Sequence, residues 1–170
     1  MKSINFRYDL LPLKDKLFRL ALRITLDTAE AEDVTQDTLI RVWEKRDELH
    51  DLKSLEAYVL TVGRNLALDR SQKREAANIS LDETEADAPD NALRADERME
   101  HEERLRRVHE IFNRLPEQQR TAMQLRDIEG KAYKEVAEIM GITEENVKVT
   151  LFRARKAVKM EYEKIENYGL

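Results

Sequence analysis

Apolar residues recur every three or four positions through most of this 170-residue chain, and this spacing constrains the fold more than any other feature. It places the apolar side chains on one face of an α-helix. The most regular stripe consists of Val147, Leu151, Ala154, Val158, Tyr162 and Ile165. Only four Gly and three Pro are present, so signals for turns between strands are scarce. The sequence therefore predicts an all-α protein.

Two groups of predicted helices are separated by a stretch that has no sustained helical period. The stretch 75–98 contains eight Asp and Glu, scattered Ala and Asn, and Pro89. Such a composition is typical of a flexible or irregular linker. We therefore predict two small helical domains, residues 1–74 and 99–170, joined by an acidic linker over residues 75–98.

The same spacing predicts which side chains are buried. The predicted core stripes of the first domain are Leu10, Leu13, Leu17, Ala21 and Ile24; Val34, Leu39, Val42 and Trp43; and Leu55, Val59, Val62 and Leu66. Those of the second domain begin with Leu105, Val108, Phe112 and Leu115, followed by Ala122, Leu125 and Ile128, and then Tyr133, Val136, Ala137 and Met140.

The sequence also predicts where helices begin and end. The predicted N-caps are Asp27 or Thr28, Ser54 and Thr143. Pro116 is predicted in the first turn of a helix, and Gly141 as a left-handed C-terminal end.

The net charge of −5 conceals a strong segregation of charge along the chain. Residues 27–51 carry nine acids and three basic residues, and the linker region is also acidic. By contrast, residues 147–160 carry five basic residues and no acid, and residues 64–74 carry four basic residues and one acid. Only these two basic stripes are suited to following the phosphates of a nucleic acid.

The segment 133–159 has the pattern of a helix-turn-helix, in which a short helix, a turn at Gly141 and a longer basic helix follow one another. At about 100° per residue, Val149, Phe152 and Lys156 lie opposite the apolar stripe of the longer helix. Exposed apolar and basic side chains are suited to thymine methyl groups and guanine edges. The alternative interpretation is a solvated basic face, which suits the C-terminal half of a helix. Combined with the preceding helix and turn, the pattern favours DNA binding.

Several other classes of protein have no support in the sequence. The three His residues lack zinc-ligand spacing, there is no Cys, and no phosphate-binding glycine loop or nucleophile elbow is present. We therefore expect no enzyme activity, no cofactor and no metal. No apolar run is long enough to insert in a membrane, and the N-terminal residues do not form a signal peptide, so a cytoplasmic protein is expected.

The sequence contains LPEQQR at residues 115–120, EGKAYKEVAEIMGIT at residues 129–143 and an acid-acid-Val-x-Gln pattern at residues 32–36. These motifs resemble those of the extracytoplasmic-function (ECF) sigma factors of bacterial RNA polymerase. The segment LPEQQRTAMQLRDIEGKAYKEVAEIMGITEENVKVTLFRARKAVK is similar to their promoter-reading C-terminal domain. The segment TAEAEDVTQDTLIRVWEKRDEL is similar to their polymerase-binding helix, and SLEAYVLTVGRNLALDRSQKRE to the helix that recognises and melts the minus-ten element. The matched regions, in this order, cover most of residues 20–160.

The resemblance implies roles for individual residues. For the minus-thirty-five element, the implied base-reading positions are Lys148, Val149, Phe152 and Arg153, with Lys156 on the same exposed side and Tyr133, Lys134 and Thr143 placed near helix starts to meet phosphates. For the minus-ten element, the implied residues that hold phosphates of the displaced strand are Arg64, Arg70, Lys73 and Arg74. Asn65 and Tyr58 are the implied contacts to an unstacked base, and a buried position is an equal alternative for Tyr58. The implied contacts to the clamp helices of the largest polymerase subunit are Asp33, Gln36, Asp37 and Leu39. An acidic helix start can also be merely solvated.

The resemblance also implies partners, which are core RNA polymerase, promoter DNA and an anti-sigma factor. In the free chain the two domains are expected to be able to pack together and hide both basic stripes. Two alternatives remain open at this point. One is a dimeric helix-turn-helix regulator that acts without polymerase, and the other is a protein-interaction adaptor that does not bind DNA.

Overall fold

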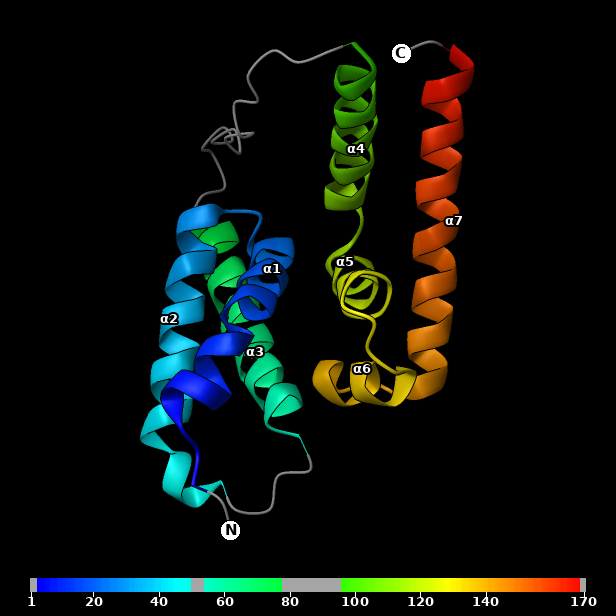
Figure 1. Cartoon of the computed structure of the whole chain (residues 1–170). Helices are drawn as coiled ribbons and strands as arrows, with labels where there is room; N and C mark the ends of the chain where they lie inside the picture. Colours follow the sequence, from blue (N-terminus) through cyan, green and yellow to red (C-terminus); the bar gives the residue numbers. More distant parts are fainter. Residues whose placement is uncertain (1–2, 50–53, 78–95, 169–170) are drawn as a thin grey trace.

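The computed structural model describes residues 3–49, 54–77 and 96–168, and every regular element in these ranges is helical (Figure 1). The all-α prediction is therefore confirmed. The N-terminal elements are a π-helical turn Phe6–Leu10, a 3-10 turn Leu11–Leu13, α1 Lys14–Thr25, α2 Thr28–Glu44, a 3-10 turn Arg46–Glu48 and α3 Leu55–Ala77. The C-terminal elements are α4 Asp96–Arg114, α5 Glu117–Met123, a π-helical turn Gln124–Ile128, α6 Tyr133–Met140 and α7 Glu144–Tyr168.

Helices α1, α2 and α3 pack against one another as a three-helix bundle (Figure 1). The predicted caps form, because Asp27 accepts a hydrogen bond from the Glu30 amide at 2.9 Å and Ser54 accepts one from the Ala57 amide at 3.1 Å. Caps of this kind contribute about 1 kcal/mol each. Gly63 lets α3 approach α1 closely, because a Cβ at this position would collide with the Leu17 side chain.

In the C-terminal half, α5 and α6 pack against α7, and α4 lies beside the distal part of α7 (Figure 1). Gly141 ends α6 with φ 67°, in the left-handed region where glycine has no Cβ penalty. Thr143 then caps α7 by accepting a hydrogen bond from the Asn146 amide at 3.1 Å. The predicted helix-turn-helix is therefore present. Pro116 differs slightly from the prediction, because it is the N-cap of α5 and not a residue of its first turn.

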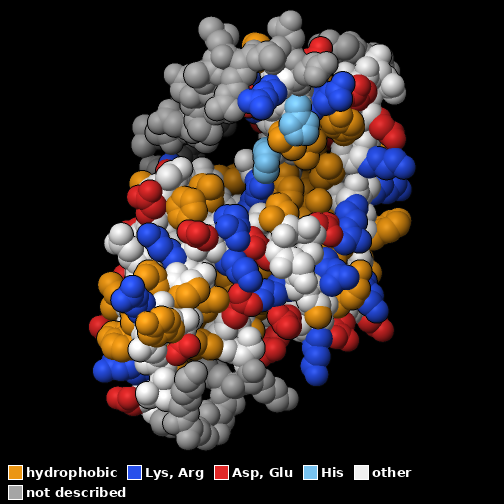
Figure 2. Space-filling model, viewed as in Figure 1, with side chains coloured by type: hydrophobic (Ala, Val, Ile, Leu, Met, Phe, Trp, Pro, Cys, Tyr) orange, Lys and Arg blue, Asp and Glu red, His pale blue; other side chains and the backbone are white. Residues whose placement is uncertain are grey.

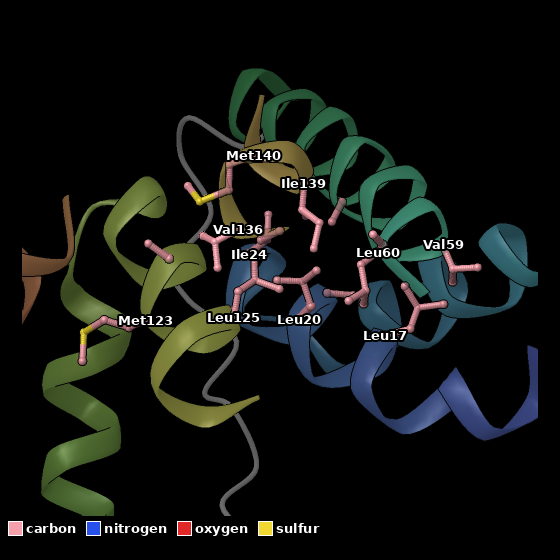
Figure 3. Packing of buried hydrophobic residues seen from close by; sticks show 14 of the residues in the cluster. Leu17, Leu20, Ile24, Val59, Leu60, Met123, Leu125, Val136, Ile139 and Met140 are labelled. Atoms are coloured by element: carbon pink, nitrogen blue, oxygen red, sulfur yellow. The ribbon is translucent and has the colours of Figure 1, made fainter. Parts of the chain in front are cut away.

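The two halves share one apolar core. Helix α6 packs on α3, and α5 packs on α1. Figure 3 shows Val136 and Ile139 of α6 gathered with Leu20 and Ile24 of α1 and Leu60 of α3. All five side chains are at most 1% exposed. Burial of such side chains is worth about 1.5–3 kcal/mol each, so this contact contributes substantially to the closed arrangement.

Two predicted core positions are exposed and need correction. Ile128 is 47% exposed, because the π-helical turn Gln124–Ile128 changes the register of the chain after α5. Leu105 is also 47% exposed, and burial on α4 is concentrated near its C-terminal end at Ile111 and Phe112, with Leu115 buried directly after the helix. Trp43, predicted as core, is only half-buried, and its ring lies edge-on to Phe6 at 5.7 Å.

On α3 the predicted stripe is only partly right. Val59 is buried, but Leu55, Val62 and Leu66 are half-buried. The positions that are buried instead are Ala57, Leu60, Gly63 and Ala67. Helix α3 is contacted by α1 and α2 and also by α6, so more than one of its faces is covered. A helix covered on several faces has no single apolar stripe for the spacing to reveal.

The ends of the predicted linker also differ from the structure. Residues 75–77 still belong to α3, and residues 96–98 already belong to α4. The remainder of the predicted linker, residues 78–95, lies outside the described residues, as does the segment 50–53 of the predicted loop 45–54. The first part of that loop contains the helical turn Arg46–Glu48.

Candidate nucleic-acid interface

The exposed face of α7 has the arrangement that the helical wheel predicts. Val147, Leu151 and Ala154 are at most 1% exposed and hold α7 against the rest of the domain. Phe152 is 67% exposed and Val149 is 45% exposed. A Phe that is two-thirds exposed on a basic helix contributes little to the core of its own chain, so it is available to a partner.

An open pocket of 570 Å³ lies on this face, between α6 and α7. Its lining residues are Tyr133, Lys148, Phe152, Arg155, Lys156 and Lys159. Four of them are predicted minus-thirty-five residues, so the structure brings these four together. Arg155 and Lys159 were missed, although both belong to the basic stripe 147–160 and lie one and two turns beyond Phe152. An aromatic pocket rimmed by four cations is suited to an anionic partner such as a nucleic-acid backbone.

Cations and hydrogen bonds fix the geometry of this pocket. Two cations contact the Tyr133 ring: Arg126 Cζ lies 4.4 Å and Lys148 Nζ 5.6 Å from the ring centroid. Arg155 donates two hydrogen bonds to Asp127, from Nε at 3.0 Å and from Nη2 at 2.5 Å. Because Asp127 holds Arg155, the cations that are most accessible to a partner are the lysines of α7. The carboxylate also raises the pKa of Arg155, which keeps the guanidinium charged.

The other predicted minus-thirty-five residues lie outside the pocket lining. Lys134 is exposed at the start of α6, and Thr143 is the N-cap of α7. Arg153 and Val149 are exposed on α7. All eight predicted residues thus belong to the helix-turn-helix, and each is at least partly accessible.

The predicted minus-ten residues on α3 differ in their accessibility. Asn65 and Lys73 are exposed, whereas Tyr58, Arg64, Arg70 and Arg74 are half-buried. The Nε atom of Arg64 is buried and has no hydrogen-bond partner among the described residues. Tyr58 packs partly against the core, in keeping with the alternative interpretation of this residue.

The predicted polymerase-binding residues lie on α2, where Asp33 and Gln36 are exposed and Asp37 is half-buried. Leu39 is only 6% exposed and lies in the core, so its prediction as a contact residue is wrong. Leu39 belongs to the predicted apolar stripe of this helix, and this position was the signal that should have excluded it from the polymerase contacts. Asp33 and Asp37 both pair with Arg70 of α3, and the Asp37 Oδ2–Arg70 Nη2 distance is 2.6 Å. The structure therefore joins a predicted polymerase surface to a predicted DNA surface.

Polar contacts between the two halves surround the shared apolar core. Arg19 of α1 donates two hydrogen bonds of 2.8 Å to Glu129, and Lys131 pairs with Glu56 of α3. Arg120 of α5 donates to the carbonyl oxygens of Arg23 and Ile24, at 2.7 and 3.2 Å. These carbonyls end α1, where the helix itself supplies no donors. Figure 2 shows basic and acidic side chains mixed over this face of the molecule, including the boundary between the two halves.

Arg23 makes a second polar cluster at this boundary. It donates to Gln124 at 2.8 Å, to Asn113 at 3.0 Å and to His109 Nδ1 at 2.9 Å. Burial first, and then the positive charge of Arg23, lower the pKa of His109. The lowered pKa favours the neutral imidazole, in which Nδ1 can accept the hydrogen bond from Arg23.

The expectation that domain packing hides both basic stripes is wrong for the second stripe. Lys148, Arg153 and Lys156 remain exposed although the two halves are in contact. The contact uses α5 and α6, whereas these basic residues lie on the exposed face of α7.

Two family models match the chain in the order of its two halves. Residues 12–77 match Sigma-70 region 2, and residues 105–158 match Sigma-70, region 4. The chain is 29% identical over 161 residues to the RNA polymerase sigma-H factor of Pseudomonas aeruginosa, covering 89% of this chain and 83% of the relative. It is 29% identical over 155 residues to the ECF RNA polymerase sigma factor SigL of Mycobacterium tuberculosis, covering 88% and 84%. The chain belongs to the extracytoplasmic-function sigma factors.

Further relatives agree with this assignment. This chain is 32% identical over 149 residues to the probable RNA polymerase sigma factor RfaY of Xanthomonas campestris. The match covers 84% of this chain and 36% of that longer relative. Among solved structures, the sigma factor RpoE in complex with the anti-sigma factor NepR from Bartonella quintana superposes with a TM-score of 0.76 and 27% identity. That comparison covers 94% of this chain and 97% of the solved chain, so it includes both halves of this chain.

Membership of this family settles the choice between the interpretations that the sequence left open. The sigma factor acts in promoter-specific initiation by core RNA polymerase. A dimeric regulator is not favoured, because residues 12–77, which would have to serve dimerisation, match sigma region 2. The family is not one of catalytic enzymes. None of the helices that the structure describes is long and apolar enough to cross a bilayer.

Proposed function

We propose that the sigma factor divides its work between three surfaces. The helix-turn-helix of residues 99–170 reads the minus-thirty-five element, α3 in residues 1–74 binds and melts the minus-ten element, and the acids of α2 bind the polymerase clamp helices. The chain between α3 and α4, within the predicted linker 75–98, connects the two DNA-binding units. The observation that supports this division most directly is the exposed pocket of Phe152, Tyr133 and four cations on α7.

On the minus-thirty-five element, α7 enters the major groove with Phe152 and Val149 toward the bases. Lys148 and Arg153 bond base edges or phosphates, and Lys134 and Thr143 hold the backbone beside the groove. Two exposed apolar side chains favour thymine, because its methyl group is the apolar feature of the major groove. Contacts of this kind discriminate between bases by about 1–3 kcal/mol per base pair.

Binding to the polymerase requires Asp33 and Asp37, with Gln36 between them. Side chains at i and i+4 lie on one helix face, so the two carboxylates present a single negative patch to a basic partner. Such complementarity orients docking and speeds it. Tethering both DNA-binding domains to one enzyme then supplies the effective concentration that each weak DNA contact needs.

The contact between the halves implies a regulated opening. If the two promoter elements are read at separate places, α6 must leave α3 and α5 must leave α1. We further propose an anti-sigma factor as a partner that stabilises the closed arrangement, in analogy with the RpoE–NepR complex. Because core polymerase and the chromosome are cytoplasmic, we propose the cytoplasm as its location.

Run-off transcription across a promoter library tests the proposal. Core polymerase with the sigma factor should select a subset of promoters that core enzyme alone does not use. Arg153→Ala should weaken selection of the minus-thirty-five element and leave binding to core enzyme intact, whereas Asp33→Arg with Asp37→Arg should impair binding to core enzyme. Failure of the purified chain to bind core polymerase would refute the proposal.

A further inference from the structure

Arg70 lies at the point where the proposed polymerase surface and the proposed minus-ten surface meet. Its Nη1 atom contacts Asp33 and lies 3.6 Å from Glu30, and its Nη2 atom lies 2.6 Å from Asp37. All three carboxylates belong to α2, whereas Arg70 belongs to α3. One guanidinium therefore bridges the acidic face of α2, and the fork of the arginine side chain suits this bidentate arrangement.

The cluster leaves Arg70 unavailable to a nucleic acid in the free chain. Three carboxylates and one guanidinium carry a net charge of −2, so a phosphate approaching Arg70 meets an excess of negative charge. The Arg70 side chain is 24% exposed, whereas those of Asp33 and Asp37 are 66% and 41% exposed. The carboxylates are thus more accessible to a partner than the arginine that they hold.

A second ion pair continues this arrangement along the two helices. One turn further along α3, Arg74 contacts Asp27 with an Nη1–Oδ2 distance of 2.5 Å. Asp27 is also the N-cap of α2, so this carboxylate is committed to the fold. Asp33 and Asp37 have no capping role in α2. A partner can therefore bind these two carboxylates without disturbing the start of the helix.

We infer that docking of Asp33 and Asp37 on core polymerase releases the Arg70 guanidinium for a phosphate of the single-stranded minus-ten element. This inference rests on the proposed function, because it uses its polymerase and DNA surfaces. Ion pairs as accessible as these are weak, so basic residues of a partner can replace Arg70 at little cost. The free sigma factor thus keeps one of its DNA contacts neutralised until it is on the enzyme.

The masking is tested on the full-length free chain with a fluorescein-labelled single-stranded DNA of mixed sequence, by fluorescence anisotropy at low salt. Asp33→Asn with Asp37→Asn should bind the oligonucleotide about 5–10-fold more tightly than the parent chain, an order of magnitude set by one additional phosphate contact. The matched control is Glu32→Gln with Glu44→Gln, which removes the same charge from exposed positions of α2 that are not partners of Arg70. Its affinity should stay within about twofold of the parent.

A third variant identifies Arg70 as the residue that is released. In an Arg70→Gln background, Asp33→Asn with Asp37→Asn should give no more gain than the control pair. An equal gain with and without Arg70, an equal gain from the control pair, or no gain at all would overturn the inference. Such a cycle isolates the coupling between residues that share one network.

The release itself is tested on the holoenzyme. Arg70→Gln should reduce permanganate reactivity of unpaired minus-ten thymines at least threefold without weakening binding to core polymerase, because loss of Arg70 leaves Asp33 and Asp37 accessible to the enzyme. Unchanged reactivity would overturn the inference, even if the chain acts as a sigma factor. Conversely, a parent chain that does not bind core polymerase would refute the proposed function, and the oligonucleotide measurement would still report whether Arg70 is masked.

Discussion

The ion pair between Arg19 and Glu129 allows a quantitative prediction about the closed arrangement. Arg19 lies on α1 and Glu129 follows the π-helical turn after α5, so the pair joins the two halves. The Glu129 side chain is only 5% exposed, whereas that of Arg19 is 46% exposed. Arg19→Ala would remove both hydrogen bonds of 2.8 Å and leave a nearly buried carboxylate with one remaining donor, Gln124 at 2.9 Å.

The magnitude follows from these contacts. Removing one partner of a fully buried ion pair costs about 3–5 kcal/mol, whereas exposed pairs are worth about 0–1 kcal/mol. Arg19 is half exposed and Gln124 still donates to Glu129, so we expect an intermediate loss of about 2 kcal/mol. This corresponds to about a 30-fold decrease in the ratio of closed to open chains.

The assay uses the absence of cysteine from the chain, which allows two single cysteines to be introduced without background labelling. Spin labels at the exposed positions Glu44 of α2 and Glu163 of α7 would report the distance between the halves. A urea titration at constant ionic strength would give the free energy of their separation for the parent and for Arg19→Ala. The control is Arg106→Ala, whose ion pairs to Glu103 and Glu110 lie within its own helix.

Equal free energies of separation for the parent and Arg19→Ala would refute this reasoning. It would mean that the apolar contact of α6 with α3 and the hydrogen bonds of Arg120 hold the halves together without help from the ion pair. A loss of equal size in Arg106→Ala would point to general charge effects.

Three further predictions concern stability, DNA binding and pH. Gly63→Ala should destabilise the N-terminal bundle by about 1–3 kcal/mol in urea unfolding, because the new Cβ collides with buried Leu17; unchanged stability would mean that the helices can move apart freely. Phe152→Ala should change stability by less than about 0.5 kcal/mol, since the ring is 67% exposed, yet it should weaken minus-thirty-five binding and abolish any sensitivity to replacing thymine by uracil. Burial and Arg23 lower the pKa of His109 in the closed chain, so the open chain takes up the proton first as pH falls below about 6.5. Closure should therefore be complete above this pH and weaken below it, and His109→Gln should remove this dependence in the spin-label assay.

Local spacing predicted those parts of the structure that depend on neighbours within one helix. The caps at Asp27, Ser54 and Thr143 and the left-handed end at Gly141 are properties of a few consecutive residues. The exposure of Phe152 also follows from a single helix, because its position relative to the stripe of α7 fixes its direction. These features were therefore accessible before any tertiary contact was known.

The errors arose where a second or third helix decides burial. The stripe of α3 was misread because α6 covers a face that a lone bundle helix would leave to solvent. Ile128 was misplaced because a π-helical turn, which has no simple sequence signal, changed the register. Leu39 was assigned to a partner from the resemblance, although its apolar stripe already placed it in the core.

The sequence by itself determined that this chain is helical, that it contains a helix-turn-helix with a basic exposed face, and which sigma regions it resembles. Only the tertiary structure decided that Arg70 is held by Asp33 and Asp37, that Arg19 reaches Glu129, and that Arg155 and Lys159 complete a pocket. The reason is physical: helical periodicity fixes the direction of a side chain around its own axis. The partner of that side chain depends on how the helices pack. Arg70 and Asp37 are 33 positions apart in the chain, and Arg19 and Glu129 are 110 positions apart.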